Sequence, residues 1–424
     1  MKALLKKLSE SEGLKSSAIV TFGNLGGTAI SAIALIILSR FLGPDQFGVF
    51  SVGFSLLLIL NRAGDLGINL ATQRYLASKD NPQKQTLIQS VFIIKTFISL
   101  LILGFGLFFS NYLATHFLHL ENSLIIKFAF LSSVAVIYFE YVNTIIQSLQ
   151  YFTSFAVSIL IQALLKILGV FTMIVFSFLS PANSVILYGL TPLISGLVIS
   201  FTKKLDLLNL SLTKKIIITD LKIIAPTIKW TSLAVIAAAL ADNIDVLIVQ
   251  NLLNSTQTGI FSAGVRLATF VSLIGLSIGI VLNIRVAKYT TKNHLDKYLA
   301  KAKWLALLSF FAILLLTPFS RLMLLLPAGS SYLEGTATLV LLLISTAFLT
   351  ATAPYVSLFF LYDKPQYFAI SGILTALILI ISDFFLINSF GILGAGYARI
   401  ITRASVLVFT LIYAKTSYKQ HLKL

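Results

Sequence analysis

Long apolar runs, each close to twenty residues, recur along almost the whole chain and are interrupted only by short polar turns. A helix needs about 20 mostly apolar residues to cross the hydrocarbon core of a membrane. Lipid offers backbone groups no hydrogen-bond partners, so the runs predict helices, and they lack the alternation of barrel strands. The sequence therefore predicts an all-α polytopic membrane protein with about 12 transmembrane helices, near 17–39, 46–75, 87–110, 123–147, 154–179, 183–202, 223–250, 258–284, 302–326, 335–361, 366–387 and 391–413.

The composition excludes a soluble protein. Of the 424 residues, 57% are hydrophobic and 11% are charged, whereas soluble domains carry about 25% charged residues. The net charge of +17 would suggest nucleic acid in a soluble protein. In a membrane protein the positions of the charges decide, and no nucleic-acid partner is expected. The chain has no Cys, which excludes disulfides and thiolate chemistry.

The basic residues indicate how the chain is oriented. Twelve spans place 22 of the 32 Lys and Arg residues in the termini and loops of one side, whereas the opposite loops hold only Arg40, Lys127 and Arg321. Because cytoplasmic loops are enriched in Lys and Arg, both termini are predicted to be cytoplasmic. The predicted organisation is a basic N-terminal segment 1–16, an N-lobe 17–202, a cytoplasmic linker 203–222, a C-lobe 223–413 and a C-terminal tail 414–424.

A short sequence repeat relates the two halves. The ten residues from Gln46 to Ser55 match those from Gln257 to Arg266 at five positions, with an offset of 211. A repeat of six spans returns the chain to its starting side. The two six-helix lobes are therefore predicted to be parallel repeats, as in many transporters.

Ionisable residues within the predicted spans are costly and indicate function by default. The spans hold more basic than acidic residues, which favours an anionic substrate. The candidates for binding an anionic head group are Arg62, Lys166, Arg266, Arg399 and Arg403. The candidates for ion coupling or for buried pairing are Asp65, Glu140, Asp242, Asp245 and Asp383.

The spacing of some of these residues suggests partners. Arg62 and Asp65 are three residues apart on one helix face and are predicted to pair. Asp242 and Asp245 have the same spacing, and two carboxylates so close do not both ionise cheaply. A shared proton or cation is therefore predicted for this second pair.

Arg399 and Arg403 are four residues apart, and their span carries no acidic residue. An unpaired Arg pair suits a phosphate or another anion of the substrate. The alternative for all of these embedded charges is that they pair between helices and only stabilise the bundle.

Several kinds of chemistry have no signature in the sequence. Gly43 and Gly48 have the glycine spacing of a phosphate-binding loop, but Val49 stands where that motif needs Lys. His116 and His119 have no third ligand that would make a metal site. No catalytic set of nucleophile and base is visible, so a secondary transporter without a cofactor is predicted and not an enzyme.

The sequence also resembles a known family. The resemblance is carried by the run Leu38–Phe50 with Asp65–Asn69 and Arg74, by Asp242–Val249 with Gly259–Ser262 and Arg266, and by Gly391–Tyr397. These segments are similar to those of the Wzx-type O-antigen flippases of the multidrug/oligosaccharidyl-lipid/polysaccharide (MOP) exporter superfamily.

The resemblance implies two six-helix lobes around a cavity, with Arg62, Asp65, Asp242, Asp245 and Arg266 at or near it. It implies translocation of an undecaprenyl-diphosphate-linked oligosaccharide across the bacterial inner membrane by alternating access, with H⁺ or Na⁺ as the coupling ion. The implied partners are this lipid-linked glycan, the bilayer and the polysaccharide polymerase machinery.

Three alternatives stay open at this point. A drug-efflux antiporter of the same superfamily would favour an acidic cavity, which the basic excess disfavours. A lipid II flippase usually has fourteen spans rather than twelve. A scaffold without transport activity predicts that the embedded Arg residues can be neutralised without loss of function.

Overall fold

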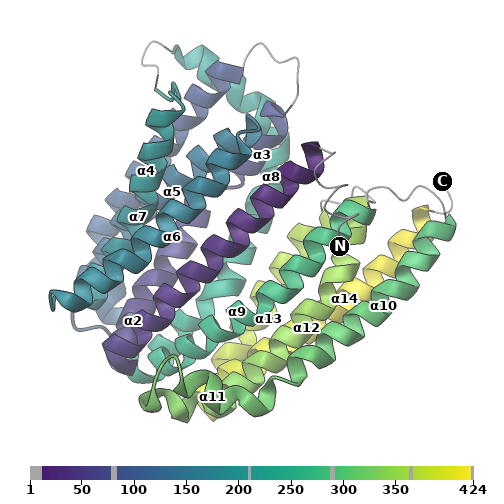
Figure 1. Ribbon diagram of the computed structural model, residues 1–424. Helices are drawn as coiled ribbons and strands as arrows, with labels where there is room; N and C mark the ends of the chain where they lie inside the picture. Colours follow the sequence, from purple (N-terminus) through teal and green to yellow (C-terminus); the bar gives the residue numbers. More distant parts are fainter. Residues whose placement is uncertain (1–11, 78–83, 209–211, 287–291, 362–365, 422–424) are drawn as a thin grey trace. The chain divides into compact units, whose positions relative to one another are not determined.

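A computed structural model describes residues 12–77, 84–208, 212–286, 292–361 and 366–421, and helices joined by short turns make up most of these ranges (Figure 1). The first half contains α2 (Glu12–Asp65), α3 (Ile68–Leu76), α4 (Lys84–Tyr112), α5 (Leu124–Ser148), α6 (Phe152–Val175) and α7 (Pro181–Thr202). The second half contains α8 (Lys214–Leu252), α9 (Ser255–Val286), α10 (Lys292–Leu314), α11 (Ser320–Leu325), α12 (Thr336–Leu361), α13 (Gln366–Phe390) and α14 (Ile392–His421). Three short non-α helices complete the list of elements: η1 (Leu113–Phe117) in the first half, and η2 (Thr317–Phe319) and η3 (Ser330–Gly335) in the second.

The helices confirm the predicted fold class. In the described part of the chain, ten stretches are long and apolar enough to cross a membrane. One of them, 18–65, covers almost all of the first predicted span and most of the second, which join within α2. A further predicted span, 258–284, falls on α9, which is not among the ten. Each of the twelve predicted spans thus falls mainly on helix, although 46–75 crosses the break between α2 and α3 and 302–326 extends from α10 through η2 to α11. The chain is a multi-pass membrane protein.

The junction inside α2 has a local cause. Gly43 has φ 72° and ψ 170°, a conformation that interrupts the helix and that residues with a Cβ rarely adopt. Pro44 follows, and its fixed φ suits the first turn of the next helical stretch. The interval between the predicted spans 17–39 and 46–75 is thus a kink within α2.

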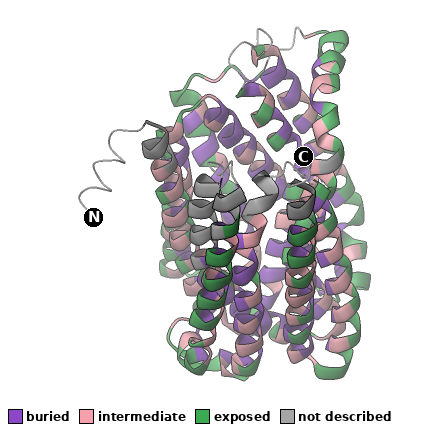
Figure 2. Cartoon of the chain, turned by 90° about the vertical axis from the view of Figure 1, so that its right-hand side faces the viewer, coloured by how far each residue is buried: buried purple, intermediate pink, exposed green. Residues whose placement is uncertain are grey.

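Large apolar side chains stand on the surface of the helices, as a lipid environment requires. Phe108 is 85% exposed and Trp304 is 74% exposed. Figure 2 shows exposed residues recurring along helices whose other positions are buried. In water such surfaces would associate, whereas against hydrocarbon they are in a matching solvent.

Packing divides the chain into two compact units. Unit 1 comprises Met1–Leu38 and Leu56–Ser232, and unit 2 comprises Ser39–Ser55 and Leu233–Leu424. The predicted lobes, 17–202 and 223–413, remain a prediction. The packing places residues 39–55 with unit 2, since this part of α2 contacts the start of α9. Of the predicted terminal segments, residues 1–11 and 422–424 lie outside the described ranges.

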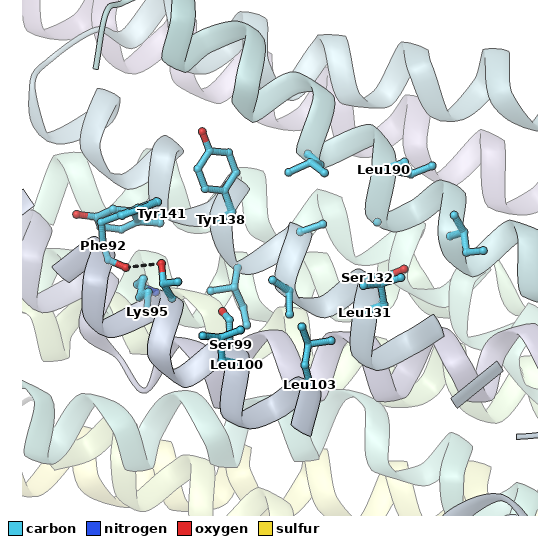
Figure 3. A pocket seen from close by; sticks show the side chains of 17 residues that line it. Phe92, Lys95, Ser99, Leu100, Leu103, Leu131, Ser132, Tyr138, Tyr141 and Leu190 are labelled. Carbon is cyan, nitrogen blue, oxygen red and sulfur yellow. Dashed lines mark hydrogen bonds between the residues drawn. The ribbon is translucent and has the colours of Figure 1, made fainter. Parts of the chain in front are cut away.

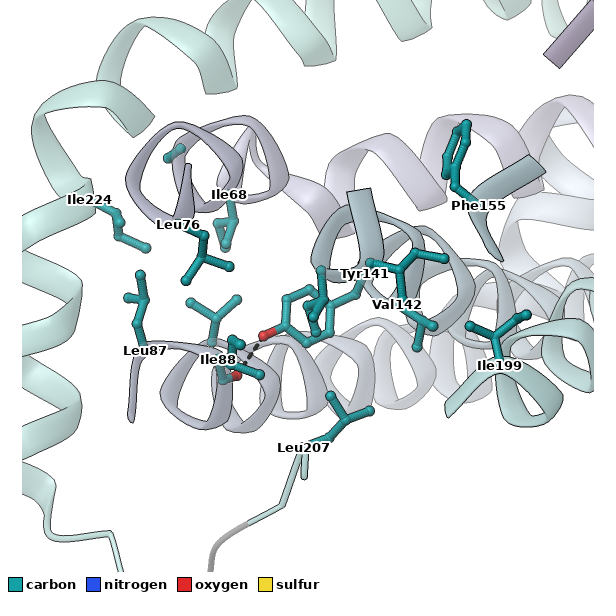
Figure 4. Close-up of a cluster of buried hydrophobic side chains, with 14 residues drawn as sticks. Ile68, Leu76, Leu87, Ile88, Tyr141, Val142, Phe155, Ile199, Leu207 and Ile224 are labelled. Carbon is teal, nitrogen blue, oxygen red and sulfur yellow. Dashed lines mark hydrogen bonds between the residues drawn. The ribbon is translucent and has the colours of Figure 1, made fainter. Parts of the chain in front are cut away.

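Unit 1 is held together by a buried apolar cluster (Figure 4). α4, α5, α6 and α7 pack side by side, and α3 closes one end of the group against α5. At the centre of the cluster, Tyr141 is 1% exposed and its hydroxyl donates to the Ile88 carbonyl at 2.5 Å. This bond satisfies the polar end of a side chain whose ring is otherwise in apolar surroundings.

Unit 2 is built around α12, which packs against α9, α10 and α14, while α13 lies against α14. The 211-residue repeat becomes a physical contact in this unit. Gly48 and Gly259 occupy the same place in the two repeats, and their backbones lie against each other. The Thr256 hydroxyl donates to Asp45 at 3.4 Å, again between positions 211 apart. Equivalent residues thus meet, which confirms that the repeat is structural.

Candidate functional site

A buried ion pair lies in unit 1 between α2 and α4. The Lys95 Nζ atom is 2.8 Å from Asp65 Oδ1, and the two side chains are 4% and 9% exposed. The same carboxylate oxygen accepts the Asn69 backbone N–H at 3.1 Å, at the start of α3. The prediction that Asp65 pairs with Arg62 is wrong. At the end of α2, Asp65 is buried against Lys95 of α4, whereas Arg62 is exposed.

Two further candidate cations of unit 1 have no carboxylate within ion-pair distance in the described structure. Arg62 is one of them. Lys166, on α6, donates to Gln162 Oε1 at 3.3 Å and lies 5.2 Å from the centre of the Tyr188 ring. Glu140 on α5 is near enough to influence Lys166 electrostatically. Unit 1 therefore carries embedded positive charge that its own acidic residues only partly neutralise.

The Arg pair of unit 2 is arranged differently. Arg399 Nε on α14 is 2.5 Å from Asp245 Oδ2 on α8, and Arg403 Nη2 is 3.2 Å from Asp242 Oδ1. The prediction of an unpaired Arg pair is wrong. A proton or cation shared by Asp242 and Asp245 stays a prediction, and each of these carboxylates has an Arg partner. The spacing along one helix did not reveal these partners, because the acids and the bases lie on different helices.

Asp383 adds a third carboxylate to this cluster. It lies on α13, is fully buried and influences both Asp245 and Arg399 electrostatically. Within the described residues neither of its carboxylate oxygens has a hydrogen-bond partner. A buried carboxylate without a partner is strongly destabilised when ionised.

Arg266 also belongs to unit 2. Its guanidinium carbon lies 4.9 Å from the centre of the Phe54 ring. This geometry is a cation–π contact. Phe54 is on α2, in the part of the chain that packs with unit 2, so the two sequence repeats meet again at this side chain.

The sequence reasoning missed two features of these clusters. Lys95 is not among the candidates from the sequence, although a Lys inside an apolar run signals a buried partner. Tyr141 and Tyr188, whose rings lie 5.7 Å from Lys95 Nζ and 5.2 Å from Lys166 Nζ, carried no signal at all. Among the described side chains, no group of three or more His, Asp or Glu is arranged to hold a metal ion.

Solved structures share this fold. The chain is similar to the lipid II flippase MurJ in an inward closed conformation, with a TM-score of 0.76, 14% identity, and coverage of 95% of this chain and 89% of MurJ. It is similar to an inward-facing multidrug resistance MATE family transporter of the MOP superfamily, with a TM-score of 0.77, 13% identity, and coverage of 93% and 96%.

A third similar structure is that of a MOP superfamily transporter from Pyrococcus furiosus for which a binding pocket of reversed polarity is described. Its TM-score is 0.62 at 13% identity, with coverage of 96% of both chains. At these identities the likeness shows the fold alone, which is that of the MOP superfamily.

Sequence comparison gives the family. No curated protein sequence matches the chain significantly. The family model described as "Polysaccharide biosynthesis protein" matches residues 14–282, which is more than half of the chain. The chain therefore belongs to the polysaccharide biosynthesis protein family.

Proposed function

We propose that this protein is a flippase that moves an oligosaccharide linked to undecaprenyl diphosphate across the bacterial inner membrane. In this proposal the glycan is a repeat unit of O-antigen or of another surface polysaccharide. Family membership supports the polysaccharide part of the proposal. The fold shared with a lipid II flippase and with MATE transporters supports the transport part.

The observation that carries the proposal is the embedded positive charge of unit 1. Arg62 and Lys166 have no carboxylate within ion-pair distance in the described structure, although charges inside a membrane are rarely left without a partner. A diphosphate would supply the missing negative charge. Arg399 and Arg403 already have carboxylate partners, so we assign them a smaller part in head-group binding than their spacing suggested.

The transport step follows from these charges. The lipid chain remains in the bilayer while the basic residues, with Arg266 in unit 2, attract the diphosphate. The two units then alternate the side from which the head group is accessible. Asp383 is the carboxylate best suited to carry a coupling proton, because it is buried and both its oxygens are without a partner in the described structure. Na⁺ remains the other candidate ion.

A multidrug antiporter is the second candidate. The likeness to a MATE transporter is as high as that to MurJ. In the cluster around Arg399, the carboxylates of Asp242, Asp245 and Asp383 outnumber the two paired Arg residues. A cationic drug would find a partner there. The two candidates make opposite predictions for Arg62 and Lys166, which a lipid diphosphate requires and a cationic drug does not.

Deletion of the gene tests the flippase proposal directly. The expected result is loss of a surface polysaccharide together with accumulation of one lipid-linked glycan on the cytoplasmic leaflet. Complementation with Arg62→Gln and Lys166→Gln is expected to restore less than about one tenth of the polysaccharide, since each removes a charge-assisted contact. Lys215→Gln, an exposed residue at the start of α8, is the matched control. Unchanged polysaccharide in the deletion strain refutes the proposal.

A further inference from the structure

Unit 1 contains a pocket that has no part in the proposed function as described so far. Its volume is about 440 Å³, and its walls come from α4, α5 and α7 (Figure 3). This size lies within the range of small-molecule sites in proteins. All of its walls belong to one unit, so the pocket exists independently of how the units are placed.

The two ends of the pocket differ in chemistry. Phe92, Lys95 and Tyr141 lie at one end, and Leu103 and Leu131 lie at the other (Figure 3). From residue 92 to residue 103 the α4 axis rises roughly 16 Å, at 1.5 Å per residue. The pocket is therefore elongated, with a cation near one end and mainly apolar side chains, together with Ser132, at the other.

The wall of the pocket is open to the surroundings of the helices. Leu100, Leu131 and Leu190 line it and are 60%, 53% and 47% exposed. All three belong to membrane-spanning helices, so the surroundings are hydrocarbon. A lipid chain can enter this pocket sideways without passing through water.

Three of the hydroxyl groups along the pocket are already engaged. Thr96 donates to the Phe92 carbonyl at 2.9 Å, Ser132 donates to the Val185 carbonyl at 3.1 Å, and Tyr141 donates to Ile88. These groups have no remaining donor for the ester oxygens of a glycerolipid. Most of the pocket wall is therefore apolar or already hydrogen-bonded, which suits a hydrocarbon chain.

The net charge near the polar end of the pocket depends on Lys95 together with the charged groups around it. Lys95 is paired with Asp65, and Arg62 and Glu140 also act on it electrostatically. These four groups balance, and Lys166, which interacts with Glu140, leaves the cluster with one excess positive charge. An anionic head group is therefore attracted to this end of the pocket.

We propose that the pocket binds the isoprene units of a polyprenyl diphosphate that are nearest the diphosphate. This inference rests on the proposed function, which supplies the class of lipid. The diphosphate lies at the end marked by Lys95, and the chain runs along α4 towards Leu103. Hydrocarbon gains little free energy by leaving lipid for an apolar pocket, so the charge at one end is what selects this lipid over its neighbours.

Photolabelling of the purified full-length protein in nanodiscs tests the pocket. The probe is a polyprenyl diphosphate with a diazirine on the isoprene unit nearest the diphosphate. We expect it to label peptides of α4 and α5 around residues 99–103 and 131–135. A tenfold excess of unlabelled polyprenyl diphosphate is expected to reduce this labelling about tenfold by mass action. The comparison probe, phosphatidylglycerol with a diazirine in its acyl chain, is expected to label the site weakly.

Two variants locate the site. Ala135 lines the pocket, and Ala135→Phe is expected to reduce the labelling about as strongly as competition does, since it fills the binding volume. Gly104 lies on α4 with nothing within 4 Å of an added Cβ and does not line the pocket, so Gly104→Phe is the matched control and keeps the labelling. The competition experiment needs no variant and therefore decides the matter if Ala135→Phe fails to fold.

Specified outcomes overturn the inference. Labelling that competition does not reduce, or equal labelling by phosphatidylglycerol, shows that an ordinary membrane lipid fills the pocket. A third outcome separates the two proposals. If the wild-type protein shows no labelled pocket peptides, and Ala135→Phe still restores transport of the lipid-linked glycan in the deletion strain, the pocket proposal is refuted and the flippase proposal stands. Competed labelling in a protein whose deletion changes no polysaccharide supports the pocket and refutes the flippase.

Discussion

Gly48 and Gly259, which are 211 residues apart, lie so close that a Cβ added to either would be 3.0 Å from the backbone nitrogen of the other. The same Cβ atoms would overlap the carbonyl oxygens of Ser255 and Pro44, which are also 211 positions apart. The contact is therefore reciprocal, and each repeat supplies one glycine and one carbonyl. Because the opposing atoms are backbone atoms, they cannot move aside as a flexible side chain would.

Adding a methyl group at this contact is expected to destabilise unit 2. Gly48→Ala or Gly259→Ala should each cost about 1–3 kcal/mol, the usual range for overpacking. Thermal unfolding of the purified protein in detergent measures the effect. Gly104→Ala, with open space around its Cβ, should leave the unfolding temperature unchanged. Wild-type stability in both variants would contradict the described contact.

The buried pair Lys95–Asp65 makes a second prediction. Lys95→Met leaves the Asp65 carboxylate buried without its partner, so a loss of about 3–5 kcal/mol is expected. The double variant Lys95→Met/Asp65→Asn removes both charges and should recover most of that loss. A double-mutant cycle on thermal unfolding gives the coupling between the two residues. Additive losses in the cycle would show that the two side chains do not interact.

The two Arg residues of α14 are expected to differ. Arg399→Gln leaves Asp245, which is fully buried, without its cation and should be strongly destabilising, whereas Arg399→Gln/Asp245→Asn should regain stability. Arg403→Gln is the matched control, because its partner Asp242 is 63% exposed and such pairs contribute about 0–1 kcal/mol. Equal losses for Arg399→Gln and Arg403→Gln would be inconsistent with the burial described here.

Asp383 is expected to act in coupling rather than in stability. Asp383→Asn keeps the size of the side chain and removes the titrating group, so unfolding should be little changed. Transport in proteoliposomes with an imposed pH gradient should lose its dependence on that gradient. Glu140→Gln, which changes a carboxylate of unit 1, provides the comparison. A variant Asp383→Asn that still responds fully to the gradient would assign coupling to another group.

The sequence predicts the helices well because lipid imposes a simple rule. Spans must be apolar and about 20 residues long, so runs of that length locate the helices without knowledge of their packing. The kink at Gly43 was also predictable, since Gly followed by Pro is a strong local signal. The repeat of Gln46–Ser55 in the second half was visible in the sequence, but the contact between its equivalent glycines was not predicted.

The partners of the embedded charges were not predictable in the same way. Spacing along one helix favoured Arg62 as the partner of Asp65, but Lys95 reaches it from α4. Arg399 meets Asp245 across 154 positions of sequence. Which helix faces which is decided by packing of the whole unit, and small differences in helix rotation change the partner. The pocket beside Lys95 could not be predicted for the same reason, since three helices form it.

The division into units has a mechanical consequence. The chain passes from one unit to the other three times, after Leu38, after Ser55 and after Ser232, and every passage lies inside α2 or α8 rather than in a loop. The units are thus joined within helices, and α2 is interrupted by the kink at Gly43 between its two passages. Any rotation of one against the other has to bend a helix, and bending is cheapest near Gly43 and Pro226, where a backbone hydrogen bond is already missing or weakened. The stiffness of these two helices therefore sets the resistance against which a bound substrate or ion must work.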